Sequence, residues 1–159
     1  MSVSILIRTA EAADVPNLVI SASGLFHDDA GVHDLTVNVE WAETEGEPYY
    51  AEAVSDPDSL CLVAEDDGAV LGHLIGRFQA ASALRPVGTA ILESIRVQPA
   101  RRGAGVGTGL VESFGDWARS KGATRAVVTA YAANERAVRF YERHGFALRS
   151  VILDKTVQA

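Results

Sequence analysis

A run of alternating glycines from Gly103 to Gly109 constrains the fold more than any other part of the sequence. The residues before it predict a strand that ends at Pro99, and the apolar spacing from Val106 to Ser120 predicts an amphipathic helix. A helix that begins among glycines exposes the unpaired N–H groups of its first turn, and glycine lets a phosphate approach without meeting a Cβ atom. The helix dipole favours an anion at this end. The turn therefore predicts an anion site, to which Arg101 and Arg102 add positive charge.

Two other glycine-rich phosphate motifs fit this segment poorly. A dinucleotide fingerprint needs Gly-x-Gly-x-x-Gly in the first strand–helix–strand unit and an acid at the end of the next strand. Here the glycines alternate and come late in the chain, and the next predicted strand ends in Thr129-Ala130. The Gly-Lys-[Ser/Thr] of a P-loop is absent. Taken alone, the run is equally consistent with a flexible turn that binds nothing.

Hydrophobic periodicity and turn signals predict one mixed α/β domain over residues 1–159, in the order β-α-α-β-β-β-α-β-α-β. Asp14 is expected to cap the first helix, and residues 24–46 are expected to form a loop with some helix. Pro48 is expected to open a short helix that ends at Val54, and Asp67-Gly68 predicts a hairpin turn. The predicted strands are 4–8, 60–65, 70–80, 89–97, 125–130 and 146–156, and the later helices are 106–120 and 134–144.

Composition and charge narrow the class of protein. The chain is 48% hydrophobic and 22% charged, which is typical of a globular protein, and no apolar run approaches the roughly 20 residues that span a bilayer. The single cysteine, Cys61, cannot form an internal disulfide, which fits a reducing compartment, so we expect the protein in the cytoplasm. No membrane partner is expected. The net charge is −7, and the segment from Asp28 to Asp67 is rich in acids and has no Lys or Arg. An aromatic-interleaved basic face is absent, so no nucleic-acid partner is expected.

Two motifs in the C-terminal half resemble those of one enzyme family. Val97-x-Pro99-x-x-Arg102-Gly103-x-Gly105-Val106-Gly107 resembles the acetyl-CoA-binding motif, [Arg/Gln]-x-x-Gly-x-[Gly/Ala], of the Gcn5-related N-acetyltransferase (GNAT) superfamily. About 30 residues later, Asn134-x-x-Ala137-x-x-Phe140-Tyr141-Glu142-x-x-Gly145-Phe146 resembles its second motif. The resemblance implies an α/β fold with a mixed, mostly antiparallel central sheet, a splayed parallel pair of strands and flanking helices.

The family sheet usually ends in two strands, whereas few residues follow Gly145 here. The last family strand is therefore expected to be very short, absent or supplied by another chain. A short final strand leaves an exposed sheet edge that a second subunit could cover, so a homodimer is an open expectation.

The resemblance also implies which residues hold acetyl-CoA, the expected co-substrate. The pyrophosphate would sit on the backbone amides of the turn, and the strand before it would offer backbone groups to the pantetheine arm and the thioester oxygen. Asn134 would contact the cofactor, or it is a plain helix N-cap; the two roles are compatible. The implied cofactor-binding residues are Ile95, Arg96, Val97, Arg102, Gly103, Ala104, Gly105, Val106, Gly107, Thr108 and Asn134.

Acetyl transfer to an amine needs a proton acceptor for the ammonium and a proton donor for the leaving thiolate. Tyr141 occupies the family position of the thiol's proton donor; the alternative is a core aromatic packed beside Phe140. Glu93 is the candidate base, placed by strand alternation on the same face as Ile95 and Val97. The alternatives are an exposed acid balanced by Arg96, or a chain of water molecules that serves as the base.

The two motifs say nothing about the acceptor or about a metal site, so these expectations rest on other residues. No metal site is expected, because the four histidines (His27, His33, His73 and His144) lack ligand spacing. Trp41, Tyr49 and Tyr50 could wall an amine pocket among nearby acids, which favours a cationic small-molecule amine or a peptide amine as the acceptor. The acids in that segment are Asp28, Asp29, Asp34, Glu40, Glu43, Glu45 and Glu47. A CoA-sensing module without catalysis and an acyltransferase with a longer acyl donor remain alternatives.

Overall fold

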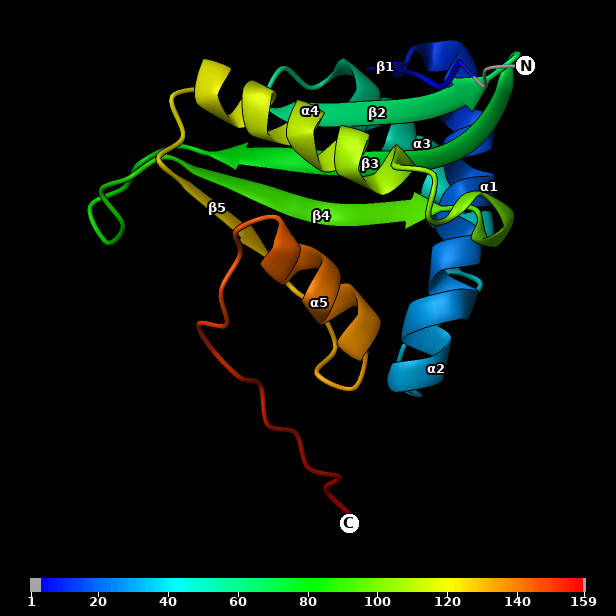
Figure 1. Cartoon of the computed structure of the whole chain (residues 1–159). Coiled ribbons are helices and arrows are strands. Elements are labelled where there is room, and N and C mark those ends of the chain that lie inside the picture. The colour runs from blue at the N-terminus through cyan, green and yellow to red at the C-terminus, as the bar shows by residue number, and fades with distance from the viewer. Residues whose placement is uncertain (1–3, 159) are drawn as a thin grey trace.

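The computed structural model describes residues 4–158, which form a five-stranded sheet flanked by helices (Figure 1). The strands lie in chain order, β1-β2-β3-β4-β5, and each neighbouring pair is antiparallel except β4 and β5, which are parallel. Their bounds are β1 Leu6–Thr9, β2 Ser59–Asp66, β3 Ala69–Gln79, β4 Thr89–Val97 and β5 Arg125–Val128. The expected mixed, mostly antiparallel sheet with one parallel pair is therefore confirmed.

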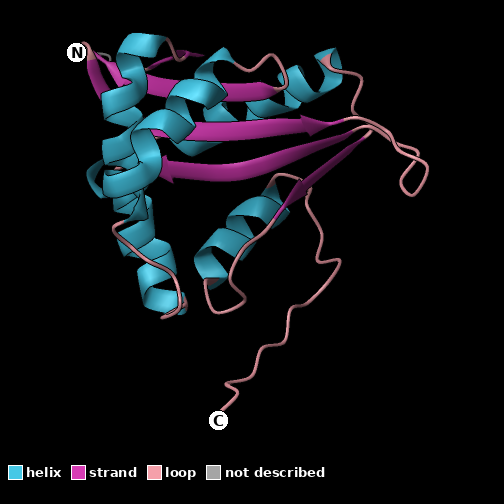
Figure 2. Cartoon of the chain, turned by 180° about the vertical axis from the view of Figure 1, so that it is seen from behind, coloured by secondary structure: helices cyan, strands magenta, loops and turns pink. Residues whose placement is uncertain are grey.

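The two faces of the sheet carry different helices, as Figure 2 shows from behind. Helix α4 (Val106–Ser120) packs on one face through Leu110, Val111 and Phe114, which join the apolar side chains of β2, β3 and β4. Helices α1 (Val15–Leu25) and α3 (Trp41–Ser55) cover the opposite face. Because side chains alternate along a strand, β2 and β3 contribute to both cores, whereas β4 contributes to the core under α4.

The first helical region is longer than expected. Helix α1 continues without a break through a π-helical turn, η2 (Phe26–Ala30), into the short helix α2 (Gly31–His33). Residues 24–33 of the expected loop are therefore helical. They carry Asp28 and Asp29 past the end of the sheet, where Figure 1 shows this helical arm facing helix α5 (Glu135–Arg143).

The prediction that Pro48 opens a helix is wrong, because α3 begins at Trp41 and contains Pro48 in its interior. Proline lacks an N–H group, so it removes one hydrogen bond from the helix, a loss that usually ends it. Here Ala42, Gly46, Tyr50 and Ala53 are buried, and this packing offsets the loss. The expected end of the helix before Asp56-Pro57 is confirmed.

Two predictions from local sequence signals, the Asp67-Gly68 turn and the bounds of α4, are confirmed. The β2–β3 hairpin turns at Asp67 and Gly68, both with positive φ, and α4 has the predicted bounds. Strand β4 contains a bulge that alternation did not reveal: Ile75 pairs with Ser94, but Gly76 pairs with Leu92, so Glu93 is an extra residue.

The predicted final strand is wrong: residues 146–158 form no strand or helix. Strand β5 pairs with β4 on one side, and no other strand of residues 4–158 lies along its second edge. The parallel strand expected after α5, which would have followed β5 through that helix, is therefore absent within the described chain. The apolar spacing that suggested a strand is real, but a strand forms only where a neighbouring strand completes its hydrogen bonds.

Candidate cofactor and acyl-transfer site

The glycine turn has the conformation that only glycine adopts readily. Gly103 and Gly105 both have φ of +84°, and a Cβ atom at either would meet no atom within 4 Å, so conformation rather than space requires glycine. Gly105 is the N-cap of α4. The amides of Val106, Gly107 and Thr108 are thus the first of the helix and have no partner within its α-helical pattern. This arrangement can bind a phosphate group.

Helix α5 packs directly against this turn. A Cβ atom on Gly107 would lie 3.2 Å from Cζ of Phe140, so a larger residue would push α5 away. Thr108 Oγ1 lies 3.4 Å from Nε2 of His144, at the end of the same helix. The two sequence motifs are therefore brought together in space, as the resemblance implied.

Strands β4 and β5 separate next to the turn. Their pairing covers Thr89–Leu92 and Arg125–Val128, after which β5 ends and β4 continues to Val97. Figure 2 shows the two ribbons diverging at this end. The backbone of Ile95, Arg96 and Val97 lies beyond the paired stretch, so the expected splay of the parallel pair is confirmed.

Charged side chains link the first helical region to this end of β4. Nη2 of Arg96 lies 3.2 Å from Oδ2 of Asp28, and Nη2 of Arg102 lies 3.8 Å from the same atom. Arg102 also donates from Nε to the carbonyl of Val97 at 3.1 Å. Burial and the nearby Arg136 lower the pKa of Arg102. Asp28 thus supplies counter-charge to two arginines that the family resemblance assigns to the expected cofactor site.

Arg96 is tightly enclosed on the α1 side of the sheet. Its guanidinium lies against Gly24, where a Cβ atom would be 2.3 Å from Cζ. Its Nε is buried and has no hydrogen-bond partner among residues 4–158. The side chain of Arg96 therefore braces α1 against β4, and its backbone is the part that faces the splay.

Asn134 caps α5, as its alternative interpretation proposed. Its Oδ1 accepts a hydrogen bond from the backbone N–H of Ala137 at 3.1 Å. Its Nδ2 donates to Oδ1 of Asp29 at 2.8 Å. Capping does not use all of the amide's hydrogen-bonding capacity, and a role in holding the cofactor stays a prediction.

Tyr141 packs as an aromatic of the α4-side core. Its ring centroid lies 5.5 Å from that of Phe140 and 5.8 Å from that of Phe146. Burial raises the pKa of Tyr141 to about 12, so the phenol is protonated at neutral pH and can donate a hydrogen bond. The structure thus confirms the packing, while the acid role stays a prediction.

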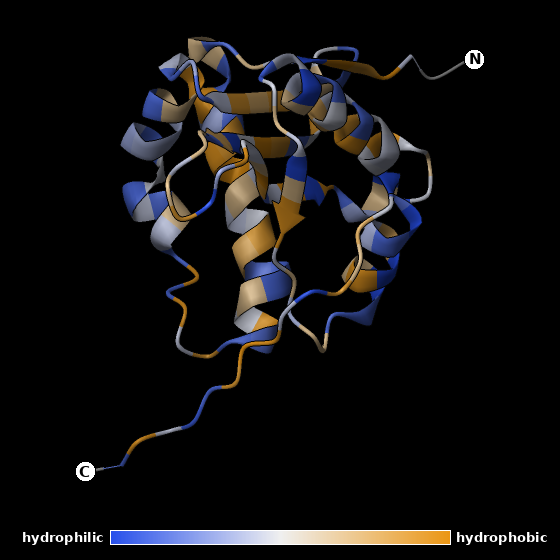
Figure 3. Cartoon of the chain, turned by 90° about the vertical axis from the view of Figure 1, so that its left-hand side faces the viewer, coloured by the Kyte–Doolittle hydropathy of each residue, from blue (hydrophilic) through white to orange (hydrophobic). Residues whose placement is uncertain are grey.

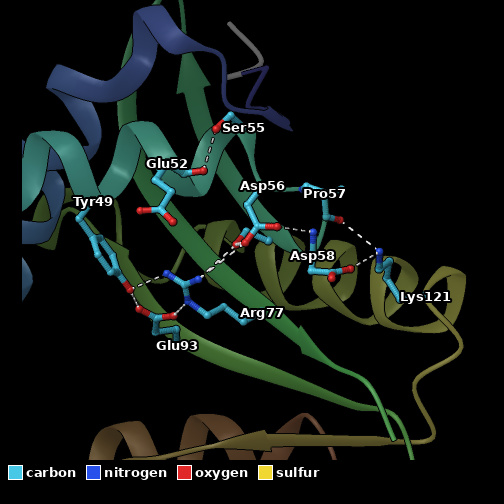
Figure 4. Close-up of polar contacts among 10 residues, drawn as sticks. Tyr49, Glu52, Ser55, Asp56, Pro57, Asp58, Arg77, Glu93 and Lys121 are labelled. Carbon is cyan, nitrogen blue, oxygen red and sulfur yellow. Dashed lines mark hydrogen bonds and ion pairs between the residues drawn. The ribbon is translucent and has the colours of Figure 1, made fainter.

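The bulge places Glu93 on the opposite face from the one expected. Ile95 and Val97 pack toward α4, whereas Glu93 turns to the α3 side and contacts Tyr49 and Arg77 (Figure 4). The alternative interpretation, an exposed acid balanced by Arg96, is not supported, because Arg77 forms the ion pair with Glu93 and Arg96 pairs with Asp28. The extra residue at the bulge breaks strict alternation, which is why the expected face was inverted.

The group around Glu93 is a closed network of donors and acceptors. The Tyr49 hydroxyl and Arg77 Nε both donate to the Glu93 carboxylate, and Arg77 Nη2 donates to the Tyr49 hydroxyl at 2.9 Å. Burial raises the pKa of Glu93. Arg77 was missed at the sequence level. The observed register pairs Arg77 with Ile91 and places Glu93 diagonally across, within reach of the Arg77 side chain.

The aromatic residues expected near the acceptor gather on the α3 side. Ring centroids of Trp41 and Tyr49 lie 5.2 Å apart, those of Tyr49 and Tyr50 5.1 Å, and those of Phe26 and Trp41 5.8 Å. Tyr50 is buried, whereas Trp41 and Tyr49 are partly exposed. The exposed acids of this region are Glu40, Glu43, Glu45 and Glu47.

The described histidines lie apart from one another in contacts and surroundings. Residues 4–158 contain no group of three or more His, Cys, Asp or Glu side chains that could hold an ion. His73 is fully buried on β3, with Nδ1 2.6 Å from Oγ of Ser21 and Nε2 3.2 Å from Oγ of Ser94. Burial and Arg96 lower its pKa to about 4. It joins α1 to the bulge of β4.

Within the described chain, no helix is long and apolar enough to cross a membrane. No curated protein matches the sequence significantly. Solved structures match it well: the tetramutant of the BH1408 protein from Bacillus halodurans has a TM-score of 0.85 at 19% identity, covering 96% of this chain and 99% of that one.

Two aminoglycoside acetyltransferases share the fold. The N-acetyltransferase AAC(6')-Iy in complex with CoA has a TM-score of 0.75 at 16% identity, with 100% of this chain and 98% of that chain covered. The enzyme meta-AAC0020 from an uncultured soil metagenomic sample, in complex with sisomicin, has a TM-score of 0.72 at 15% identity, with 97% of each covered. The model of the acetyltransferase (GNAT) family matches residues 27–146. This match covers most of the sequence and both motifs, and the chain belongs to the GNAT acetyltransferase family.

Proposed function

We propose that this protein transfers the acetyl group of acetyl-CoA to a primary amine, by direct transfer while both substrates are bound. The observation that carries the proposal is the splay of β4 from β5 directly beside the amide-lined turn at the start of α4. Ile95–Val97 pair with β3 on one side, and the splay leaves their other side without a β5 partner. The turn provides amides that suit a pyrophosphate.

The residues of the turn fit a CoA phosphate. Positive φ at Gly103 and Gly105 turns the chain so that the first amides of α4 face outward, and no neighbouring atom crowds either glycine. Arg102 adds a cation at the turn. The group bound there would be held by Gly103, Ala104, Gly105, Val106, Gly107 and Thr108, with Asn134 contributing from α5 and Ile95, Arg96 and Val97 contributing backbone groups.

Acetyl-CoA, when bound, supplies a thioester whose carbonyl the amine attacks. In our proposal a backbone N–H of the strand from Ile95 to Val97 stabilises the charge that develops on the carbonyl oxygen. Glu93 accepts the proton of the amine, directly or through water, while Tyr49 and Arg77 hold its carboxylate in place. Tyr141 donates its proton to the departing sulfur. Because its pKa is raised, the phenol still carries this proton at neutral pH.

We propose a cationic small-molecule amine as the acceptor, with a peptide amine as the second class. The supporting observations are the partly exposed rings of Trp41 and Tyr49 beside Glu93, and the exposed acids of α3. Related structures include enzymes that act on aminoglycosides, which are polycationic amines. Asp28 and Asp29, in contrast, are engaged with Arg96, Arg102 and Asn134, so they serve the cofactor side instead.

The test is a titration of the protein with acetyl-CoA, followed by free-thiol release across a panel of polyamines, aminoglycosides, amino acids and lysine peptides. We expect saturable binding and amine-dependent release of thiol. Changing Glu40, Glu45 and Glu47 to Gln should raise KM for a polycationic amine and leave the Kd for acetyl-CoA unchanged. An unchanged KM for every accepted amine would overturn the role of these acids.

The two alternatives have separate signatures. Binding of acetyl-CoA with no thiol release for any amine would favour a CoA-sensing module. Faster release with a longer acyl donor would favour a different acyltransferase, since the turn contacts the CoA and not the acyl chain.

A further inference from the structure

A fully buried imidazole lies in the apolar middle of the sheet. Hydrophobic residues predominate in the central strands (Figure 3), and His73 of β3 is 0% exposed among them. Val63, its partner across β2, and Ile75, two residues along β3, both belong to the core under α1 and α3. Burying an imidazole is costly unless its nitrogens find hydrogen-bond partners, whereas an apolar side chain needs none. A role beyond packing is therefore expected of the hydrogen bonds of His73.

The ring of His73 links two serines on different elements. Its Nδ1 lies 2.6 Å from Oγ of Ser21 on α1, and its Nε2 lies 3.2 Å from Oγ of Ser94 on β4. Burial and the charge of Arg96 lower the pKa of His73 to about 4, so the ring is neutral at neutral pH. A neutral imidazole donates from one nitrogen and accepts at the other, and a hydroxyl can do either, so both bonds can form at once. We call Ser21, His73 and Ser94 the serine–histidine chain.

The chain ends beside the extra residue of β4. Leu92 and Ile95 both pack into the core under α4. The two residues between them, Glu93 and Ser94, both face the opposite side of the sheet, where Ser94 contacts His73. The register of β4 is thus fixed on one side of Glu93 by the burial of Leu92, and on the other side by the bond from Ser94 to His73.

The bond to His73 favours one register over another. If the ladder continued from Leu92 without an extra residue, Glu93 would pair with Ile75, and Ser94 would turn toward α4 and away from His73. In the structure Ser94 takes the place opposite Ile75, and Glu93 is left as the unpaired extra residue. This register is the one in which the Glu93 carboxylate contacts Tyr49 and Arg77 (Figure 4).

We propose that His73 is a positioning residue for Glu93: held by Ser21, it holds Ser94 and so fixes the register that directs the Glu93 carboxylate. The inference rests on the proposed function, in which Glu93 accepts the proton of the amine. His73 acts through the backbone of β4 and not by contact with either substrate. The carboxylate is then held from the α3 side by Tyr49 and Arg77, and the backbone that carries it is held from the α1 side by the serine–histidine chain.

The hydrogen bond from Arg77 to Glu93 reports the position of the carboxylate without any activity. The Nε–H resonance of Arg77, assigned by its loss in Arg77→Met, should be displaced from that of a solvent-exposed arginine. Ser94→Ala breaks the chain at a partly exposed residue and should move this resonance toward the solvent-exposed value. Ser21→Ala breaks the other end of the chain and should move it in the same direction, with circular dichroism checking that each variant is folded.

The matched control is Ser23→Ala. Ser23 is another buried serine of α1, but its hydroxyl donates to Glu43 at 2.7 Å and not to His73. Its removal should leave the Arg77 resonance and kcat unchanged. A resonance that stays in place in Ser94→Ala, or that moves equally in the control, overturns the proposal.

Kinetics test the consequence for the reaction. Ser94→Ala should lower kcat by about 10–100-fold, as expected for a misplaced base, and leave the Kd for acetyl-CoA unchanged. Glu93→Gln should lower kcat by about 10²–10⁴. In the Glu93→Gln background Ser94→Ala should cause no further loss, because no base is left to position. An equal loss of kcat in both backgrounds would mean that Ser94 acts elsewhere, and would overturn the proposal.

The two levels of inference fail in different ways. A wild type that releases no thiol, or a Glu93→Gln variant as fast as the wild type, overturns the proposed function and this proposal with it. If Glu93→Gln is slow while Ser94→Ala and Ser21→Ala keep the wild-type kcat, the proposed base stands and the positioning role of His73 alone is overturned.

Discussion

The side-chain amide of Asn134 donates a hydrogen bond to the carboxylate of Asp29 across 2.8 Å, although 105 residues separate them in sequence. The bond joins the π-helical turn η2 to the N-terminus of α5, which also carries the second family motif. Together with the contacts of Asp28 to Arg96 and Arg102, it ties the N-terminal helical arm to both sides of the proposed cofactor site.

Substitutions at Asn134 should separate its two structural roles. Asn134→Ala removes the N-cap and should lower the free energy of unfolding by about 1 kcal/mol. Asn134→Ser retains a capping oxygen but removes the donor to Asp29, so it should be less destabilising than alanine. Chemical denaturation of the three proteins measures this order. Equal destabilisation by serine and alanine would mean that capping contributes little here.

Gly105 in the turn and Gly115 inside α4 can be compared directly. Gly105→Ala forces an alanine into φ of +84° and should cost about 1–2 kcal/mol of stability, together with weaker binding of acetyl-CoA. Gly115 lies inside α4 with φ in the ordinary range and room for a Cβ atom. Gly115→Ala should therefore stabilise the protein by about 0.5–1 kcal/mol and leave the Kd unchanged. Calorimetric titration and thermal unfolding measure both effects.

Removing the cation beside Glu93 should change the pH dependence of the reaction. The charge of Arg77 favours the ionised carboxylate, so Arg77→Met should raise the pKa of Glu93 further. A base must be deprotonated, and the acid limb of the kcat/KM profile should therefore move to higher pH. Arg119→Met on α4, which breaks only the exposed pair with Asp116, is the matched control. An acid limb unmoved by Arg77→Met would argue against Glu93 as the base.

Tyr141→Phe should lower kcat by about 10²–10⁴, the usual contribution of a general acid, and leave the Kd for acetyl-CoA unchanged. The ring contacts with Phe140 and Phe146 do not need the hydroxyl, so the variant should fold normally. Because the pKa is about 12, Tyr141 should cause no loss of rate on the alkaline side up to about pH 11. Steady-state kinetics with a binding titration provide the comparison; an unchanged kcat would leave Tyr141 as a packing residue alone.

The buried His73 should make stability depend on pH. Its pKa is about 4 in the folded protein and about 6.5 when unfolded, so between these values the unfolded state binds a proton that the folded state does not. Stability should therefore fall as the pH drops from about 6.5 to 4, by roughly 3 kcal/mol for this group. In His73→Gln this contribution should be missing. The difference between the two denaturation curves across pH 4–8 isolates it from the carboxylates.

Sequence patterns predicted best where one local rule decides the structure. The bounds of α4 follow from its glycine start and its apolar spacing, and the Asp67-Gly68 turn follows from its backbone preference. Prediction failed at Pro48, where burial of the surrounding helix face outweighed the local helix-breaking signal. It failed again at residues 146–158, because strand formation depends on a neighbour that the sequence of one chain does not specify.

Within the candidate site, too, the residues of local motifs were easier to predict than the contacts that depend on the tertiary structure. The positions of the turn at the start of α4 and of Asn134 at the start of α5 were predicted correctly, because both belong to continuous motifs, while their roles in cofactor binding stay predictions. The partner and face of Glu93 were not, since they depend on one extra residue in β4 relative to β3. Asp28 and Asp29 were expected among the acids of the acceptor pocket. Their contacts with Arg96, Arg102 and Asn134 arise only because α1 continues through η2 past the end of the sheet.

Because Glu93 is the extra residue at the bulge, the proposed activity depends on the number of residues in β4. Removing one residue between Leu92 and Ser94 would restore an unbroken ladder and a more regular sheet, yet it would delete or redirect the acid that Tyr49 and Arg77 hold. Insertions of several residues in the exposed connection between β3 and β4 should be tolerated, because they leave this count intact. A single-residue deletion at Glu93 should therefore abolish activity and spare the fold, whereas single-residue deletions in the connection should spare both activity and fold.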